Sequence, residues 1–261
     1  MEIEQEVLDR IKNAKRVCIL TGAGVSAESG IATFRDAQEG KGLWSQYDPQ
    51  QLASIDGFLK DPQTVWQWYQ WRRDVNKNKQ PNPAHLAIAR WQQRSHQNGN
   101  QLVSLITQNV DGLHQKAGSD PVTELHGNIW RNHCLQCNQV HQASVEAIEQ
   151  VPECEHCGGQ VRPSVVWFGE ALPEQAWREA ESAAYSCDLF LSVGTSSQVY
   201  PAAGLAALAK SQGAKVIEIN PEPTNSSVVD YQIAGKAGEV IPALIFDLSS
   251  RDLIAGSRVF L

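Results

Sequence analysis

The chain has 261 residues, of which 42% are apolar and 20% charged, and its formal net charge is −7. These values are typical of a soluble globular protein, and no apolar run approaches the roughly 18 to 20 residues of a membrane span. The acidic balance disfavours nonspecific nucleic-acid binding, which depends on clustered Lys and Arg. The first residues resemble no secretory signal, so we expect a cytoplasmic protein whose partner is a protein or a small molecule.

The first predicted elements are a helix over residues 4–14 and a short apolar strand at 17–20. A glycine-rich turn follows them. Gly22, Gly24 and Ala27 have the G-x-G-x-x-G/A spacing, in which the first glycine allows the turn and the second admits a pyrophosphate. The turn therefore favours a bound dinucleotide, although an ordinary strand-to-helix turn can have the same spacing.

The region after this turn departs from an ordinary Rossmann unit. Such a unit has a second strand that ends in an acidic residue about 20 residues further on. Here residues 40–44 read Gly-Lys-Gly-Leu-Trp, and no strand fits them. Residues 36–98 instead predict helices, with Asp61-Pro62 and Asn82-Pro83 as start signals. Because the second strand and its acid are missing, we do not expect a conventional dehydrogenase.

Three further apolar strands are predicted at 102–107, 189–193 and 215–219, and helices over 84–94, 173–186 and 201–212. Nearly continuous apolar strands that alternate with helices are typical of a parallel sheet covered on both faces. Every strand ends in small or polar residues, and ligands of such sheets bind beyond the carboxyl ends of the strands. The sequence therefore predicts an α/β protein with a Rossmann-like parallel sheet and a binding crevice at one edge.

Four of the six cysteines form a zinc-binding pattern. Cys134-x2-Cys137 is followed, after 16 intervening residues, by Cys154-x2-Cys157. A four-thiolate site leaves no position open for water, so one structural Zn²⁺ is expected. Two reduced or redox-active cysteine pairs are the alternative. We expect a small zinc-binding module at about 128–162, inserted into the α/β series.

The order of motifs along the whole chain resembles the sirtuins, the NAD-dependent protein-lysine deacylases. Besides the two cysteine pairs, the motifs are Gly22-Ala23-Gly24-Val25-Ser26, Thr33-Phe34-Arg35, Gln108-Asn109-Val110-Asp111, His126-Gly127, Val166-Trp167-Phe168-Gly169-Glu170, Gly194-Thr195-Ser196 and Asn220-Pro221-Glu222. The resemblance covers about residues 5–245. It implies one catalytic domain over 1–261, with a large NAD-binding part at about 1–127 and 163–248 and the small zinc module between them. The helical insert at about 36–98 would contribute to the acyl pocket.

The resemblance also implies which residues bind NAD. Gly22, Ala23, Gly24 and Ser26 would line the pyrophosphate, and Phe34 and Arg35 would shape the site over the nicotinamide ribose. The segment Gln108, Asn109, Val110 and Asp111 would hold that ribose and the carboxamide. The adenosine half would meet Gly194, Thr195, Ser196, Asn220, Pro221 and Glu222, with Ala237 near the adenine.

In the family's reaction the acyl group leaves the lysine for the ribose of NAD, which gives nicotinamide, free lysine and 2′-O-acyl-ADP-ribose. His126 would be the general base, because a histidine with a pKa near ~6.5 is neutral at cellular pH and can accept a proton. Val166, Phe168 and Gly169 would pair with an extended acyl-lysine peptide by strand addition. Without the resemblance, the simpler interpretation of His126 would be a structural histidine, and that of residues 166–169 an ordinary sheet edge.

The identity of the acyl group depends on Tyr69 and Arg72, which are three residues apart and share a helix face. Arginine offers a carboxylate a bidentate fork, and tyrosine adds one donor. Such pairs are common on helix surfaces. This Tyr-x-x-Arg, however, is similar to the motif of the sirtuin branch that removes succinyl and malonyl groups, and Ala53 matches the small residue that widens the pocket of that branch. We therefore expect acidic acyl groups to be preferred and acetyl groups to be removed as well.

Two other functions agree with part of the sequence. Protein mono-ADP-ribosylation would use the same NAD site, but a carboxylate clamp has no purpose without an acyl substrate. The second alternative is a non-enzymatic zinc module that senses NAD or binds nucleic acid. Between residues 128 and 162 the charged side chains include two arginines against four glutamates, so nucleic-acid binding there is not expected. The sequence is compatible with a monomer and leaves the oligomeric state open.

Overall fold

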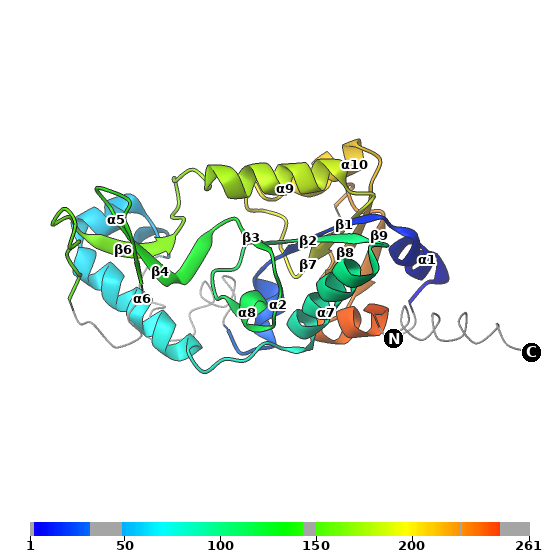
Figure 1. Ribbon diagram of the computed structural model, residues 1–261, viewed down its shortest axis with the longest axis horizontal. Helices are drawn as coiled ribbons and strands as arrows, with labels where there is room; N and C mark the ends of the chain where they lie inside the picture. Colours follow the sequence, from blue (N-terminus) through cyan, green and yellow to red (C-terminus); the bar gives the residue numbers. More distant parts are fainter. Residues whose placement is uncertain (1–2, 32–48, 143–149, 225, 246–261) are drawn as a thin grey trace, which may run out of the picture.

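The computed structural model describes residues 3–31, 49–142, 150–224 and 226–245. Six strands form a parallel sheet in the order β3-β2-β1-β7-β8-β9 (Figure 1). They are β1 (Arg16–Thr21), β2 (Leu102–Thr107), β3 (Val122–Glu124), β7 (Leu189–Val193), β8 (Lys215–Asn220) and β9 (Tyr231–Ala234). A smaller antiparallel sheet has the order β5-β4-β6. Its strands are β4 (Gly127–Cys134), β5 (Val140–Gln142) and β6 (Val161–Val165).

The helices divide between the two sheets. They are α1 (Gln5–Asn13), α2 (Ala23–Ala27), α4 (Pro49–Leu52), α5 (Ile55–Lys60), α6 (Pro62–Asn76), α7 (Pro83–Asn98), α8 (Leu113–Lys116), α9 (Glu174–Ser186) and α10 (Gly204–Ser211). In Figure 1, α5 and α6 lie beside β4 and β6 on the left, and α7, α9 and α10 lie beside the parallel sheet on the right. No helix in the described ranges is long and apolar enough to cross a membrane.

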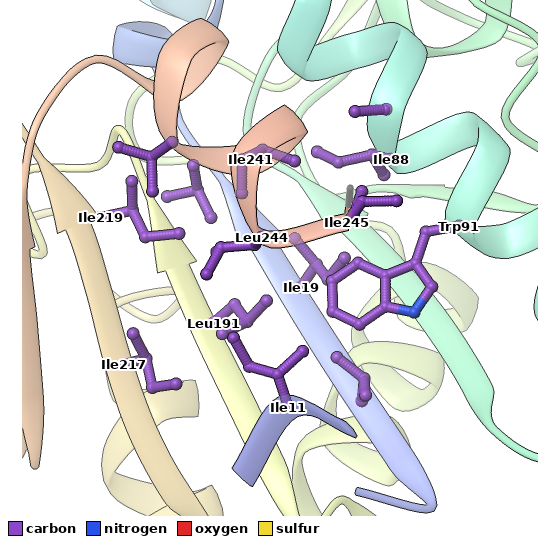
Figure 2. Close-up of a cluster of buried hydrophobic side chains, with 14 of the residues drawn as sticks. Ile11, Ile19, Ile88, Trp91, Leu191, Ile217, Ile219, Ile241, Leu244 and Ile245 are labelled. Atoms are coloured by element: carbon purple, nitrogen blue, oxygen red, sulfur yellow. The ribbon is translucent and has the colours of Figure 1, made fainter. Parts of the chain in front are cut away.

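Both faces of the parallel sheet are covered, as the sequence predicts. Neighbouring residues of one strand point to opposite faces, so they belong to different cores. In β1, Ile19 belongs to a core shared with α1, α7 and the helical segment 237–245. Figure 2 shows this core, in which Trp91 of α7 and Leu244 pack over the strands. The neighbouring residue, Leu20, faces a second core with α9 and α10. The predicted Rossmann-like fold is confirmed.

The second strand of the Rossmann-like sheet is β2, the strand predicted at 102–107, and the expectation that no strand lies at 40–44 is not tested. Residues 40–44 lie outside the described ranges, but β2 pairs with β1 in parallel, with Arg16 opposite Leu102. The strand order is that of a Rossmann sheet. The second strand comes late in the chain because helices α4 to α7 precede it. It is followed by Gln108 rather than by the acid of an ordinary dinucleotide fold.

The helices before β2 are positioned by side-chain caps and by one buried arginine. Asp61 accepts a hydrogen bond from the Thr64 N–H (3.0 Å), so α6 begins where the Asp-Pro pair predicts. Arg73 of α6 donates through Nε to the Ile129 carbonyl of β4 (2.5 Å) and through Nη2 to Asn132 Oδ1 (2.5 Å). Burial lowers the pKa of Arg73 to about 10. These bonds attach α6 to the small sheet, whereas α7 packs against β2.

Candidate active site

The glycine-rich turn lies where β1 and β7 end side by side. The Gly22 N–H donates to the Val193 carbonyl (3.0 Å), and the Gly24 N–H donates to the Gly194 carbonyl (2.8 Å). A Cβ atom at either Gly22 or Gly24 would lie 2.8 Å from the Gly194 oxygen. Glycine is therefore required here by the contact between two strand ends, independently of any ligand. Ala23 begins α2 directly after this turn.

Polar side chains from neighbouring strand ends are joined in one hydrogen-bond network. Asn109, after β2, donates through Nδ2 to the Gly22 carbonyl (2.9 Å) and to Ser26 Oγ (3.1 Å). Gln108 Nε2 donates to Thr195 Oγ1 after β7 (3.0 Å). Asn220, at the end of β8, donates to the Thr195 carbonyl (3.0 Å). The carboxyl edge of the sheet is therefore a preorganised polar surface, which is where such folds bind dinucleotides.

Asp111 is the buried carboxylate of this network. Its Oδ2 accepts from Ser26 Oγ (2.7 Å) and its Oδ1 accepts from the Leu113 N–H (2.8 Å). Burial raises the pKa of Asp111, while these hydrogen bonds and the positive charge of Arg72 act to lower it. Its backbone carbonyl accepts from Trp130 Nε1 (2.6 Å). The Asp111 side chain is thus held firmly next to the glycine-rich turn.

The other residues predicted to bind NAD lie in different environments. The Val110 carbonyl accepts from the Ile129 N–H (2.9 Å). Ser196, Pro221 and Glu222 are exposed beyond β7 and β8. Ala237 is buried in the core against α1 and α7, with 3% of its surface exposed. Phe34 and Arg35 lie outside the described residues.

His126 follows β3 and faces the segment after β2. Its Nδ1 lies 3.0 Å from the Gln108 carbonyl oxygen. Because a carbonyl can only accept, Nδ1 carries the proton and Nε2 keeps its lone pair. Burial lowers the pKa of His126, although the bond to Gln108 opposes this. The imidazole is therefore neutral near pH 7 and able to accept a proton at Nε2.

The segment predicted to bind a peptide lies between His126 and Ala53. The Val166 N–H donates to the His126 carbonyl (2.9 Å), and the Phe168 N–H donates to the Ala53 carbonyl (2.8 Å). Gly169 follows with a φ of 85°, a conformation that favours glycine. Two backbone donors of this segment are therefore already used within the protein, so an added substrate strand would pair with its other groups.

The predicted acyl-binding residues come together between α6 and the small sheet. Ala53 and Tyr69 are buried in one apolar cluster, which also contains Trp68 and Trp167. Tyr69 Oη accepts a hydrogen bond from Trp167 Nε1 (2.9 Å). Trp167 belongs to the motif Val166-Trp167-Phe168-Gly169-Glu170. The sequence did not predict its hydrogen bond to Tyr69, because the two residues are 98 positions apart.

Arg72 lies at the side of this cluster. Its guanidinium carbon is 4.8 Å from the centroid of the Trp68 ring and 5.5 Å from that of Tyr69. Within the described ranges, no acidic side chain forms an ion pair with it. The positive charge of Arg72 acts to lower the pKa of Asp111, which burial raises. Tyr69 and Arg72 therefore share a face of α6, and the guanidinium of Arg72 has the capacity to bind an anionic group.

The four cysteines predicted to bind zinc lie together. Their Sγ atoms are all within 4.8 Å of one another. Cys134 and Cys157 are 3.5 Å apart, and Cys137 and Cys154 are 3.7 Å apart. A tetrahedral Zn²⁺ with Zn–S bonds of about 2.3 Å requires sulfur atoms about 3.8 Å apart. The cluster therefore suits one structural zinc ion, at the end of β4.

Comparison with known proteins agrees with this geometry. The NAD-dependent protein deacylase 2 of Pyrobaculum aerophilum is 47% identical over 94% of this chain and 96% of its own length. The NAD-dependent protein deacylase of Ralstonia nicotianae is 51% identical over 90% of this chain and 93% of its own length. Close relatives along nearly the whole chain are thus named as deacylases.

Solved structures share the fold. A Sir2 homologue in complex with NAD has a TM-score of 0.87 and 43% identity, covering 96% of this chain and 95% of its own. A Sir2 homologue variant with 2′-O-acetyl ADP-ribose has a TM-score of 0.86 and 43% identity, covering 95% and 98%. A Sir2 complex with a p53 peptide and NAD⁺ has a TM-score of 0.81 and 30% identity, covering 96% and 100%.

A family model described as the Sir2 family matches residues 22–201 of this chain, from the glycine-rich turn to the loop after β7. This range holds the turn, the polar network after β2, His126 and the cysteine cluster. With relatives near 50% identity over nine-tenths of the chain, the chain belongs to the Sir2 family, the sirtuins.

Proposed function

We propose that this protein is an NAD-dependent protein-lysine deacylase that removes succinyl and malonyl groups, and also acetyl groups, from lysine side chains. The observation that carries the proposal is the arrangement around His126. A neutral imidazole with its lone pair on Nε2 stands beside the polar edge of a Rossmann-like sheet, next to the segment that would bind a peptide. The deacylase names of the relatives agree with it.

The residues present fit NAD. The network of Ser26, Asn109, Asp111 and Thr195 lies at the carboxyl edge of the sheet, where doubly wound folds bind dinucleotides. When bound, NAD would supply a ribose whose bond to nicotinamide breaks and whose hydroxyl receives the acyl group. Support comes from the Sir2 homologues in complex with NAD and with 2′-O-acetyl ADP-ribose.

In this proposal the protein's own residues position NAD and activate the attacking ribose hydroxyl. The Gln108 carbonyl fixes the tautomer of His126, so that Nε2 takes a proton from the attacking hydroxyl. Asp111 and Asn109 hold the nicotinamide end of NAD, and Ser196, Asn220 and Glu222 meet the adenosine end. The remaining site assignments, including Phe34, Arg35, Pro221 and Ala237, also belong to the proposal.

The preference for acidic acyl groups rests on Tyr69 and Arg72. A guanidinium without an acidic partner in the described part of the chain can form charge-assisted hydrogen bonds with a carboxylate. Ala53 leaves room beside them, since its side chain is a single methyl group. The proposal disfavours mono-ADP-ribosylation, for which this pocket would have no use.

The proposal also covers the division of the chain into parts, the form of the substrate and the cellular location. We assign the NAD-binding part to about 1–127 and 163–248 and the zinc module to about 128–162, within one catalytic domain. Substrates would bind as extended acyl-lysine peptides, in line with the Sir2 complex that holds a p53 peptide. None of the six cysteines forms a disulfide, and we propose that the protein works in the cytoplasm, where thiols stay reduced. No nucleic acid or membrane is part of the proposed function.

The test compares matched succinyl-, malonyl- and acetyl-lysine peptides with NAD by following nicotinamide release. Arg72→Met should lower kcat/KM for the succinyl peptide by about 10- to 100-fold, because a charge-assisted hydrogen bond is lost. The loss for the acetyl peptide should be much smaller. Arg178→Met is the control, since Arg178 is exposed on α9 and, among the described residues, forms its ion pair with Glu174 on the same helix.

Two outcomes contradict different parts of the proposal. Acetyl removal that equals or exceeds succinyl removal, with both unchanged in the Arg72→Met variant, would refute the acidic-acyl preference and leave a deacylase. Absence of nicotinamide release with every peptide would refute deacylation itself.

A further inference from the structure

The side chains of Trp167 and Tyr69 form a hydrogen-bonded pair inside the protein. The indole Nε1–H of Trp167 donates to Tyr69 Oη over 2.9 Å, and the two ring centroids are 6.4 Å apart. Tyr69 is completely buried, and only 2% of the Trp167 surface is exposed. Bulk water therefore does not compete for this hydrogen bond.

Trp167 is held in place by three neighbouring residues. Its backbone N–H donates to Glu170 Oε2 (2.7 Å), and the guanidinium carbon of Arg162 lies 3.3 Å from the indole centroid. Arg162 is itself ion-paired with Glu170. The ring of Phe58 packs on the indole with centroids 5.2 Å apart. The direction of the indole N–H is thus fixed by the protein.

This contact determines what the Tyr69 hydroxyl can do. An indole nitrogen can only donate, so Tyr69 Oη is the acceptor and its own hydrogen stays available. Among the residues that the structure describes, none accepts that hydrogen. Burial raises the pKa of Tyr69, so the phenol keeps its proton at neutral pH. A buried O–H group without an acceptor is unfavourable unless a ligand provides one.

We propose that Trp167 is a positioning residue for acyl recognition, which by donating to Tyr69 Oη leaves the Tyr69 hydroxyl hydrogen for a carboxylate oxygen of the acyl group. The inference rests on the acidic-acyl preference proposed above. The Arg72 guanidinium carbon lies 5.5 Å from the Tyr69 ring centroid. In the proposal one carboxylate oxygen pairs with Arg72 and the other accepts the hydroxyl hydrogen of Tyr69. An acetyl group lacks this carboxylate and gains nothing from the arrangement.

The variant Trp167→Phe keeps an aromatic ring and removes the N–H donor. The ratio of KM for the succinyl peptide to KM for the acetyl peptide should rise by about three- to tenfold. Trp91→Phe is the matched control. Trp91 is also buried, in a core separate from that of Trp167, and its Nε1 donates to Gln101 Oε1 (2.9 Å). In that variant the ratio should stay constant.

A double-mutant cycle separates positioning from general damage to the pocket. In a Tyr69→Phe background the hydroxyl is gone, so adding Trp167→Phe should leave the KM ratio unchanged. If Trp167→Phe changes the ratio by the same factor with and without the Tyr69 hydroxyl, the inference is overturned. A wild-type enzyme with no preference for succinyl over acetyl would instead refute the underlying acyl preference.

A measurement on the wild-type protein keeps the inference testable if Trp167→Phe does not fold. The indole ¹⁵N–¹H resonance of Trp167 can be assigned from its displacement in Tyr69→Phe. Adding a succinyl-lysine peptide without NAD should move this resonance downfield, because a phenol that donates to a carboxylate becomes a stronger acceptor. An acetyl-lysine peptide should move it less. Equal displacement by both peptides would contradict the proposed role of Trp167.

Discussion

The Nδ1 atom of His126 lies 3.0 Å from the carbonyl oxygen of Gln108, which leaves Nε2 as the nitrogen with a lone pair. This contact joins the proposed base to the strand end that would hold the nicotinamide ribose. The proposed base and the proposed NAD site are therefore not independent. A displacement of the segment after β2 would displace the base as well.

His126→Ala should keep NAD binding and lose nearly all deacylation, because the proposed general base is removed. Nicotinamide release with the succinyl peptide and NAD affinity by calorimetry measure the two properties. Burial lowers the pKa of His126, and the base acts only when neutral. The acid limb of kcat/KM in the wild-type enzyme should therefore have its midpoint below about 6.5, the ordinary value for histidine. Substantial turnover by His126→Ala would refute the assignment.

Gly24→Ala should destabilise the fold even without NAD. Its Cβ would lie 2.8 Å from both the Cα and the carbonyl oxygen of Gly194, and such overpacking typically costs about 1–3 kcal/mol. Gly204→Ala is the control, because nothing lies within 4 Å of a Cβ there and Gly204 stands in α10. Urea unfolding should show a lower free energy of unfolding for the first variant only. Equal stability of both would contradict the contact between the turn and the β7 loop.

Acidification should destabilise the protein between about pH 6.5 and 4. Burial lowers the pKa of His85 to about 4, whereas in the unfolded chain it is about 6.5. In this interval the unfolded chain binds a proton that the folded protein excludes. The free energy of unfolding therefore falls as the pH falls, by roughly 3 kcal/mol for this group. The pKa of the adjacent buried His114 is also well below its ordinary value, which adds to the effect.

Urea unfolding at pH 7 and pH 5 measures this dependence. His85→Gln should make the difference between the two pH values smaller, and His96→Gln should not, because His96 is exposed. An unchanged difference in His85→Gln would contradict the assignment to this buried pair.

Removal of zinc should unfold or aggregate the protein rather than merely inhibit it. The four thiolates hold together the end of β4 and the loop before β6, and binding free energy at such sites is folding free energy. Circular dichroism and light scattering during chelation, with parallel measurement of released zinc, test the expectation. A folded and active zinc-free protein would show that the cluster is dispensable.

The strands that the sequence predicted and those that it missed differ in burial. The predicted strands correspond to β1, β2, β7 and β8, which are covered on both faces and therefore read as continuous apolar runs. The missed strands of the parallel sheet, β3 and β9, lie at its two edges, and the three strands of the antiparallel sheet were missed as well. Strands β3 and β9 are short and partly exposed, so they lack that pattern.

The sequence by itself determined the fold class, the zinc ligands and the order of motifs that indicates a sirtuin, because each strand, cysteine pair and motif is a short local pattern and their order can be read along the chain. The spacing of residues over a short stretch indicates the period of a helix, the burial of a strand and a C-x2-C metal-binding turn. Such spacing does not indicate which distant residues come into contact in the fold. Only the tertiary structure decided that β2 is the second Rossmann strand, that the Gln108 carbonyl selects the tautomer of His126, and that Trp167 donates to Tyr69. These contacts join residues that are far apart in sequence, so their partners depend on how the sheets and helices pack.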